Sequence, residues 1–230
     1  MKRDDASAHD PNLSLAAAAH EIKNALGPLA MTLQLAERQL LGGQPVAPGD
    51  LSFARSQVRR LASLVEDLLD QTRADLGDLA FHPREVDLCS VVTEAVETFR
   101  RGKPAPIVVE LPPAPLVASV DVGRIQQVLV NLLENAVRYS PAGSNVTVLL
   151  ARPAPATARI EVRDAGPGLS ADEQARIFDR FVRGAASEGT SGLGLGLYLC
   201  RAIVEQHGGT IGVESLPGAG ATFWINILAG

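Results

Sequence analysis

The sequence contains few of the residues that mark several classes of protein. Of its 230 residues only two are cysteine and 4% are aromatic, and no run of about 18 apolar residues occurs. The two cysteines, Cys89 and Cys200, are too few for a disulfide framework, so we expect a reducing, cytoplasmic compartment. The polar start, MKRDDASAHDPN, is not a signal peptide, and no transmembrane helix is predicted.

Positive charge is also scarce. The chain has 21 Lys and Arg against 26 Asp and Glu, a formal net charge of −5. This balance argues against nucleic acid as a partner, because phosphate backbones attract clustered Lys and Arg. We also expect no membrane contact by this chain. Its length and 46% hydrophobic content suffice for one or two domains with a core.

Residues 13–78 predict a helical hairpin that follows a polar tail at 1–12. The first helix carries an apolar seam with alternating spacings of four and three residues, at Leu15, Ala19, Ile22, Leu26, Leu29, Leu33, Ala36 and Leu40. A loop, GGQPVAPGD, follows, and Asp50 is predicted to cap the second helix. That helix has the same spacing at Leu51, Ala54, Val58, Leu61, Val65, Leu68 and Thr72.

A lone hairpin leaves part of both apolar stripes uncovered. Pairing of this antiparallel hairpin with a second copy into a four-helix bundle would cover them, so we expect a homodimer. The alternative is a hairpin that packs on the rest of its own chain.

After a predicted linker at 79–84, the pattern changes. Residues 85–230 mix short apolar runs with helical ones, which predicts an α/β sandwich. The predicted strands are 85–88, 107–111, 116–120, 145–150, 158–163, 210–214 and 221–227. The predicted helices are 90–99, 122–139 and 193–206, with Asp121 as the N-cap of the second.

Three polar or glycine-rich clusters in this region could bind a ligand. Asn131, Asn135 and Arg138 share one face of the 122–139 helix, where amide oxygens suit Mg²⁺ and a guanidinium suits phosphate. DAGPG (164–168) follows a strand, and Asp164 there could accept a hydrogen bond from an amine. GTSGLGLGL (189–197) leads into a helix whose N–H groups could meet phosphate. Taken singly, these clusters also fit a solvated helix face and plain turns.

A fourth cluster lies on the first helix, in AAHEIKNALGPL. His20 falls beside the apolar seam, so we expect it to be exposed. Asn24 is one turn further on the same face, and Glu21 is the adjacent residue. A neutral imidazole nitrogen is a nucleophile, and a neighbouring carboxylate can take up its proton.

The clusters HEIKN, NLLENAVRYS, DAGPG, IFDRFVRG and GTSGLGLGL occur in an order that resembles the sensor histidine kinases of two-component systems. The resemblance covers nearly the whole chain. It implies a dimerisation hairpin followed by a Bergerat-type ATP-binding domain, the fold shared with gyrase. The implied reaction is ATP-dependent autophosphorylation, followed by phosphotransfer to an aspartate of a response regulator and possible removal of phosphate from that partner.

The resemblance implies roles for individual residues. His20 would accept the phosphoryl group, Glu21 would be its acid–base partner, and Asn24 would orient a water molecule. Asn135 would ligate Mg²⁺ beside Asn131, and Asp164 would bind adenine. The remaining nucleotide contacts would come from Arg138, Tyr139, Gly166, Gly168, Phe178, Phe181, Thr190, Ser191, Gly192, Leu193, Gly194, Leu195 and Gly196, with the two phenylalanines anchoring a lid.

The sequence departs from the family pattern at two places. Ala25 stands where many members have proline, with Pro28 placed slightly later and expected to bend the helix. Ala165 stands where asparagine is common. Neither change removes a residue with an implied chemical role, so we expect an active kinase. Two alternatives are an ATPase of the same fold that does not phosphorylate itself, and a dimeric scaffold without enzyme activity. The short tail suggests either a core of a longer receptor or a short kinase.

Overall fold

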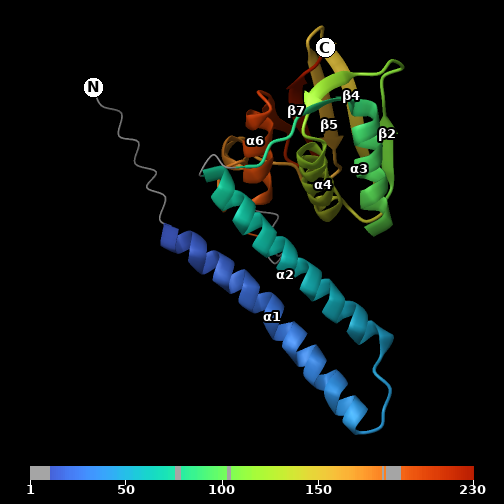
Figure 1. The fold of residues 1–230 in the computed structure, drawn as a ribbon, viewed down its shortest axis with the longest axis vertical. Helices are drawn as coiled ribbons and strands as arrows, with labels where there is room; N and C mark the ends of the chain where they lie inside the picture. The colour runs from blue at the N-terminus through green and yellow to red at the C-terminus, as the bar shows by residue number, and fades with distance from the viewer. Residues whose placement is uncertain (1–10, 76–78, 103–104, 183, 185–192) are drawn as a thin grey trace, which may run out of the picture. The chain divides into compact units, whose positions relative to one another are not determined.

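The computed structural model describes residues 11–75, 79–102, 105–182, 184 and 193–230 (Figure 1). The chain forms two compact units, one built on two long helices and the other on a sheet with its own helices. None of the helices described is both long and apolar enough to cross a membrane.

The first unit contains α1 (Pro11–Leu41) and α2 (Pro48–Asp75) as far as Asp70. Both predicted helices are confirmed, and α1 continues as one helix through Pro28. The prediction that Asp50 caps α2 is wrong, because the helix begins two residues earlier and Asp50 lies in its first turn. Pro48 favours this early start, since proline has no N–H to leave unpaired in a first helical turn.

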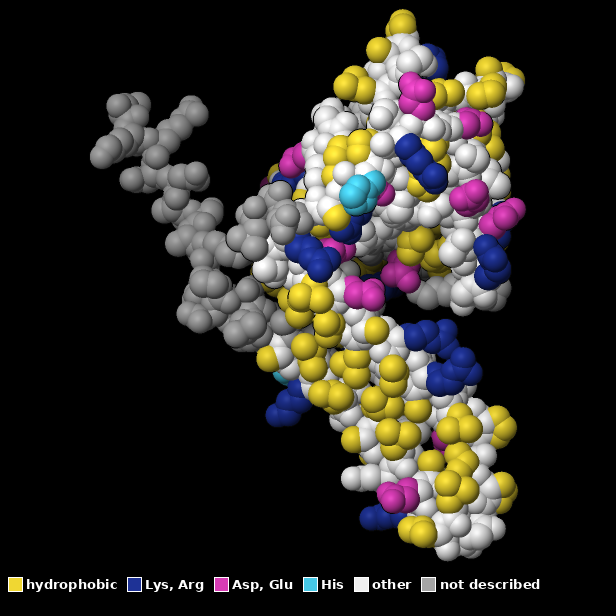
Figure 2. Space-filling view, viewed as in Figure 1, with side chains coloured by type: hydrophobic (Ala, Val, Ile, Leu, Met, Phe, Trp, Pro, Cys, Tyr) yellow, Lys and Arg dark blue, Asp and Glu magenta, His cyan; other side chains and the backbone are white. Residues whose placement is uncertain are grey.

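The apolar stripe of each helix divides into two rows. In one row Ala36 of α1 and Ala54 of α2 are buried, and Ile22, Leu29, Leu61 and Leu68 are half-buried. The residues of the other row alternate with these along each stripe and are 46–64% exposed. They are Leu26, Leu33, Leu40, Leu51, Val58 and Val65. Figure 2 shows apolar side chains along the visible side of these helices. Within this chain, therefore, only half of each stripe is covered.

The second unit is an α/β sandwich, as predicted. Its helices are α3 (Leu88–Gly102), α4 (Val122–Tyr139), α5 (Ala171–Arg176) and α6 (Gly196–Gln206). Its strands are β1 (Arg84–Asp87), β2 (Ile107–Glu110), β3 (Val117–Val120), β4 (Val146–Ala154), β5 (Thr157–Arg163), β6 (Thr210–Ser215) and β7 (Ala221–Leu228). The main sheet has the order β2-β4-β5-β7-β6, in which only β2 and β4 are parallel. β1 and β3 form a separate antiparallel pair.

Helix α5 was not predicted, because its six residues, ADEQAR, carry no apolar periodicity. A capping box stabilises its N-terminus. Ser170 Oγ accepts from the Glu173 amide, and the Glu173 carboxylate accepts from the Ser170 amide at 2.8 Å. The spacing of Ser170 and Glu173 was the available sequence signal. The predicted start of α6 at Leu193 is also wrong, because the helix begins at Gly196.

The core lies between one face of the main sheet and α3, α4 and α6 (Figure 1). Alternate residues of the central strands point into it, among them Val148, Ile160 and Ile225, which are at most 1% exposed. This alternation is the pattern of a sheet with one covered face.

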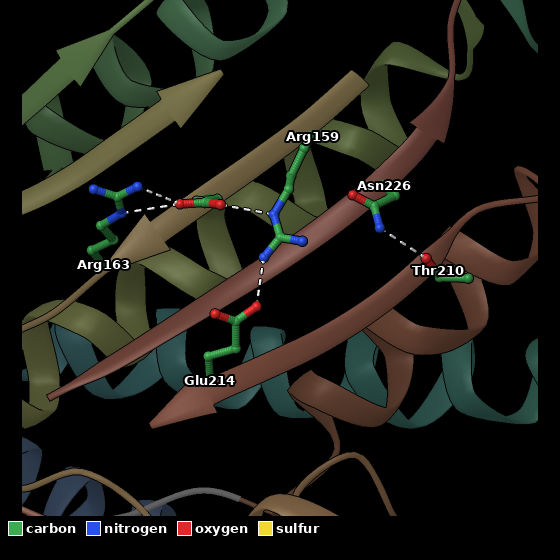
Figure 3. A network of polar contacts seen from close by, with 6 residues as sticks. Arg159, Arg163, Thr210, Glu214 and Asn226 are labelled. Carbon is green, nitrogen blue, oxygen red and sulfur yellow. Dashed lines mark hydrogen bonds and ion pairs between the residues drawn. The ribbon is translucent and has the colours of Figure 1, made fainter. Parts of the chain in front are cut away.

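The opposite face carries a charged network that includes Arg159, Arg163 and Glu214 (Figure 3). Glu161 accepts from Arg163 and Arg159, and Arg159 reaches across to Glu214 at 2.8 Å. The Arg159 guanidinium lies 4.5 Å from the centre of the Trp224 ring. Trp224 in turn lies against Gly212 of the neighbouring strand, so the absence of a side chain at Gly212 makes room for the indole.

We expect Gly212→Ala to destabilise the second unit. The added Cβ would lie 2.2 Å from Trp224 Cζ2, and displacing the ring also disturbs the Arg159 bridge, so the free energy of unfolding should fall by about 1–3 kcal/mol. Urea unfolding followed by Trp224 fluorescence measures this change. Gly102→Ala is the matched control, because its Cβ would meet nothing within 4 Å. Equal unfolding midpoints for the two variants would contradict the prediction.

Candidate functional site

The site begins on the polar face of α4. Asp121 caps this helix, as predicted, because its side chain accepts from the Arg124 amide at 3.1 Å. The buried side of the helix consists of Ile125, Val128, Leu129, Leu132, Leu133 and Ala136. Asn131 and Asn135 are half-buried and Arg138 is exposed. The three polar side chains therefore lie away from the core, on the side the spacing predicts.

The start of α6 approaches this face. A Cβ at Gly196, the first residue of α6, would lie 2.7 Å from Asn131 Oδ1. Only glycine permits this approach without displacing the amide. The first turn of a helix also presents backbone N–H groups that have no partner within the helix. Gly196, in the glycine string, therefore lies directly against Asn131 of α4.

Asp164 follows β5 and is held by two backbone amides. Its Oδ1 accepts from Gly166 N at 2.8 Å and from Ala221 N at 3.2 Å. Burial raises the pKa of Asp164, and the two hydrogen bonds only partly oppose that rise. A carboxylate held this way needs a further donor to offset its desolvation. We expect Oδ2 to take that donor from a ligand.

The DAGPG turn packs against the end of α4. A Cβ at Gly166 would lie 2.8 Å from Asp164 Oδ1 and 3.1 Å from Tyr139 O. The Ala165 amide donates to Ser140 Oγ at 3.2 Å. Gly168 has a φ of +72°, and a Cβ there would lie 2.1 Å from Leu216 O. These contacts place Asp164 beside the end of α4 that carries Asn135, Arg138 and Tyr139.

Phe178 and Phe181 stand at the base of the segment predicted to form a lid. Phe178 is buried in the core and meets Phe223 edge to face, with ring centroids 6.3 Å apart. Phe181 has a φ of 59°, and its amide donates to Gly194 O at 3.1 Å. Gly194 has a φ of +68°, and a Cβ there would lie 2.7 Å from Val182 O. The residues on either side of the segment are therefore joined directly.

A second contact at this base was missed. Arg180 Nη2 donates to the Tyr198 hydroxyl at 2.6 Å, and its guanidinium lies 4.5 Å from the centre of the Tyr198 ring. Arg180 lies within the IFDRFVRG cluster, and Tyr198 follows the glycine string directly. An arginine and an aromatic ring flanking a predicted lid were the available signal.

Some predicted residues lie outside the part of the chain that is described. These are Thr190, Ser191 and Gly192 of the glycine string and the side chain of Glu21. Leu195, also predicted to contact the nucleotide, is 2% exposed, with its side chain in the protein interior. Leu193 is also buried. Only the backbone at these two positions is left to meet a ligand.

His20 and Asn24 lie on α1, in the other unit. Both are exposed, as their place beside the apolar seam predicts. Ala25, the residue that replaces the expected proline, is fully buried. An exposed imidazole on a helix is open to attack a substrate carried by another domain.

No group of three or more His, Cys, Asp and Glu suited to a metal ion occurs among the described residues. A divalent cation beside α4 would therefore depend on amide oxygens such as that of Asn135, on ligand oxygens and on water. This set fits Mg²⁺, which keeps several waters and binds through substrate phosphates.

Two family models match the chain. Residues 12–77 match the His Kinase A (phospho-acceptor) domain. Residues 120–229 match the histidine kinase-, DNA gyrase B- and HSP90-like ATPase family. Together these matches include His20, the polar face of α4, Asp164 and the glycine string.

Curated and solved relatives agree with these matches. The chain is 35% identical over 213 residues to the adaptive-response sensory kinase SasA of Synechococcus sp. strain CC9311, covering 91% of this chain and 54% of that protein. The chain thus spans about half the length of this relative. The structure of Acinetobacter baumannii histidine kinase AdeS is similar, with a TM-score of 0.68, 25% identity and coverage of 91% and 97%. Full-length ShkA in complex with AMPPNP has a TM-score of 0.66 at 26% identity, covering 96% of this chain and 46% of that one.

Proposed function

Because the chain belongs to the sensor histidine kinases, we propose that it binds ATP and transfers the γ-phosphoryl group to its own His20. The observation that carries this proposal is the joining of Asp164, the polar face of α4 and the start of α6 in one site. The exposed histidine on α1 supplies the acceptor.

Each part of the ATP site has a distinct task. Asp164 Oδ2 accepts from the exocyclic amine of adenine, and Gly166 leaves room for the ring because it has no side chain. Arg138 and the N–H groups at the start of α6 meet phosphate oxygens. Arg180 and Tyr198 hold the base of the lid segment in place. The Asn135 amide oxygen would hold Mg²⁺, and that ion would supply neutralisation of the phosphate charge.

His20 acts as the nucleophile. A ring nitrogen forms a bond to the γ-phosphorus while the bond from that phosphorus to the β,γ-bridging oxygen breaks and ADP leaves. The other ring nitrogen then gives up its proton to the Glu21 carboxylate. The product is a phosphoramidate, which passes its phosphoryl group to an aspartate of a response-regulator receiver domain. Asn24, one turn from His20, orients a water molecule when phosphate is removed from that partner.

This chemistry requires ATP, so we place this part of the protein in the cytoplasm. The direct test is incubation of the chain with γ-labelled ATP and Mg²⁺. Acid-labile, base-stable label on the protein supports the proposal, because phosphoramidates are cleaved in acid. Nucleotide binding and hydrolysis without label would favour the ATPase alternative. Neither binding nor label would favour a scaffold.

We further propose that the chain is a homodimer joined through α1 and α2. The exposed row is apolar from Leu26 to Leu40 on α1 and from Leu51 to Val65 on α2, and water contact there is unfavourable. A second copy presents the same row, and two hairpins form a four-helix bundle.

A charge in the exposed row should separate the dimer. We expect Val58→Glu, in the middle of the row on α2, to convert the chain to a monomer in sedimentation or light scattering, because the carboxylate would be buried without a partner. Ser56→Glu is the control, since Ser56 is exposed on the same helix outside the row. A Val58→Glu chain that remains dimeric would rule out this surface as the interface.

A further inference from the structure

The segment Leu79–His82, which the sequence assigns to the linker, is bound to the ATPase domain. The Leu79 side chain is 7% exposed, and its carbonyl accepts from Gln206 Nε2 at 2.9 Å. The ring of Phe81 meets the ring of His207 edge to face, with centroids 4.7 Å apart. The His82 amide donates to Asp121 Oδ2 at 2.9 Å. Three of the four residues in this segment thus contact the domain.

His207 is the centre of these contacts. It follows the last residue of α6 and is 9% exposed. The Asp121 amide donates to His207 Nε2 at 3.0 Å, so Nε2 carries the lone pair. The ring proton is therefore assigned to Nδ1, which donates to Ile203 O at 2.7 Å. The ring is held at both nitrogens, and its position presents a rigid surface to Phe81.

Asp121 connects the segment to α4. One carboxylate oxygen accepts from the Arg124 amide and caps the helix, while the other accepts from the His82 amide. These bonds hold the pKa of Asp121 below its ordinary value despite the opposing effect of burial. The far ends of the two helices form the nucleotide site, at Asn135 of α4 and Gly196 of α6. The segment is thus fastened to the two elements that position ATP.

We propose that Phe81 and His207 are positioning residues for autophosphorylation, because they dock Leu79–His82 and so set the length of the tether between α2 and the ATPase domain. The inference rests on the proposed function. Releasing the segment adds its four residues to the chain that connects the hairpin to the domain. Each added residue extends the reach by up to about 3.3–3.6 Å.

A longer connection lowers the effective concentration of the bound nucleotide at His20. Effective concentration falls as about the −3/2 power of the length of a tether that already spans its sites. Release of the segment therefore predicts a lower kcat for autophosphorylation, by roughly two- to fivefold. The ATP site itself is unchanged, so the KM for ATP should stay the same.

Three changes to the full chain test this. Phe81→Ala removes the ring that meets His207 and should lower kcat roughly two- to fivefold at constant KM, while Phe81→Tyr, which keeps the ring, restores it. Inserting five Gly and Ser residues after Gly77 lengthens the tether without touching the docking contacts and should produce the same fall. His82→Ala is the control, because its exposed side chain is not used in the docking and its amide remains.

Hydrogen exchange at the His82 amide measures docking without any kinase activity. We expect protection in the wild type and in the insertion variant, and loss of protection in Phe81→Ala. An unprotected His82 amide in the wild type would overturn the docking. A freed amide with unchanged or raised kcat would overturn the positioning role, as would an insertion that leaves kcat unchanged. If the wild type is never labelled by ATP, the proposed function fails, and exchange still decides the docking.

Discussion

Replacing His20 by alanine should abolish covalent labelling by γ-labelled ATP. The imidazole is the group that we propose forms the bond to phosphorus, and the methyl side chain of alanine has no nucleophilic atom to replace it. The fold should be unaffected, because His20 is exposed and alanine is the best helix former. The expected result is label at the background of a sample without enzyme, with nucleotide affinity equal to that of the wild type.

The control for His20→Ala is His82→Ala, a second exposed histidine on the same chain. It should retain full labelling. Label that persists at wild-type strength in His20→Ala would show that another residue is phosphorylated. A loss of nucleotide affinity in the same variant would show that the substitution acts through the fold instead.

The second large effect is expected for Asp164→Asn, which should abolish nucleotide binding without unfolding the protein. The amide oxygen can still accept from Gly166 N and Ala221 N. The new NH₂ group, however, would face the exocyclic amine of adenine, so that two donors meet. Losing a hydrogen bond to a charged group and leaving a donor unpaired should weaken binding at least about a hundredfold. Titration of a fluorescent ATP analogue measures this directly.

The Asp164→Asn protein should be more stable than the wild type, although its affinity for nucleotide falls. Burial raises the folded-state pKa of Asp164 above its ordinary value of 3.8, so the folded protein holds that proton more tightly than the unfolded chain. The contribution of this group is favourable below 3.8 and is lost as pH rises through the raised pKa. Asparagine does not titrate. Asp164→Asn should therefore unfold at a higher temperature than the wild type at pH 7, and the difference should shrink as pH falls.

Asp172→Asn is the matched control for Asp164→Asn, because Asp172 is an exposed aspartate on α5 of the same unit. It should keep wild-type affinity. Wild-type affinity in Asp164→Asn would remove Asp164 from the adenine site. Loss of affinity together with a lower unfolding temperature would instead assign Asp164 a structural role.

The candidate site was largely predictable because its residues lie in local patterns. Asn131, Asn135 and Arg138 follow helical spacing, so one helix places them on one face whatever surrounds it. The glycines at 166, 168, 194 and 196 were visible in the sequence, but their partners were not. Arg180 and Tyr198 were missed because they are 18 residues apart, and only the fold brings their side chains into contact.

Sequence alone determined the hairpin, the α/β sandwich, the polar face of α4 and the exposure of His20, since each follows from the periodicity of nearby residues. Its few cysteines, its lack of long apolar runs and its scarcity of positive charge argued against several classes of protein before any motif was considered. Only the tertiary structure decided which row of the apolar stripe stays exposed, how Asp164 is held, and that Leu79–His82 is docked. These depend on contacts between distant segments, such as Asp121 with His207, 86 residues apart. Periodicity in one segment carries no information about such pairs, because their geometry is set by how the elements pack.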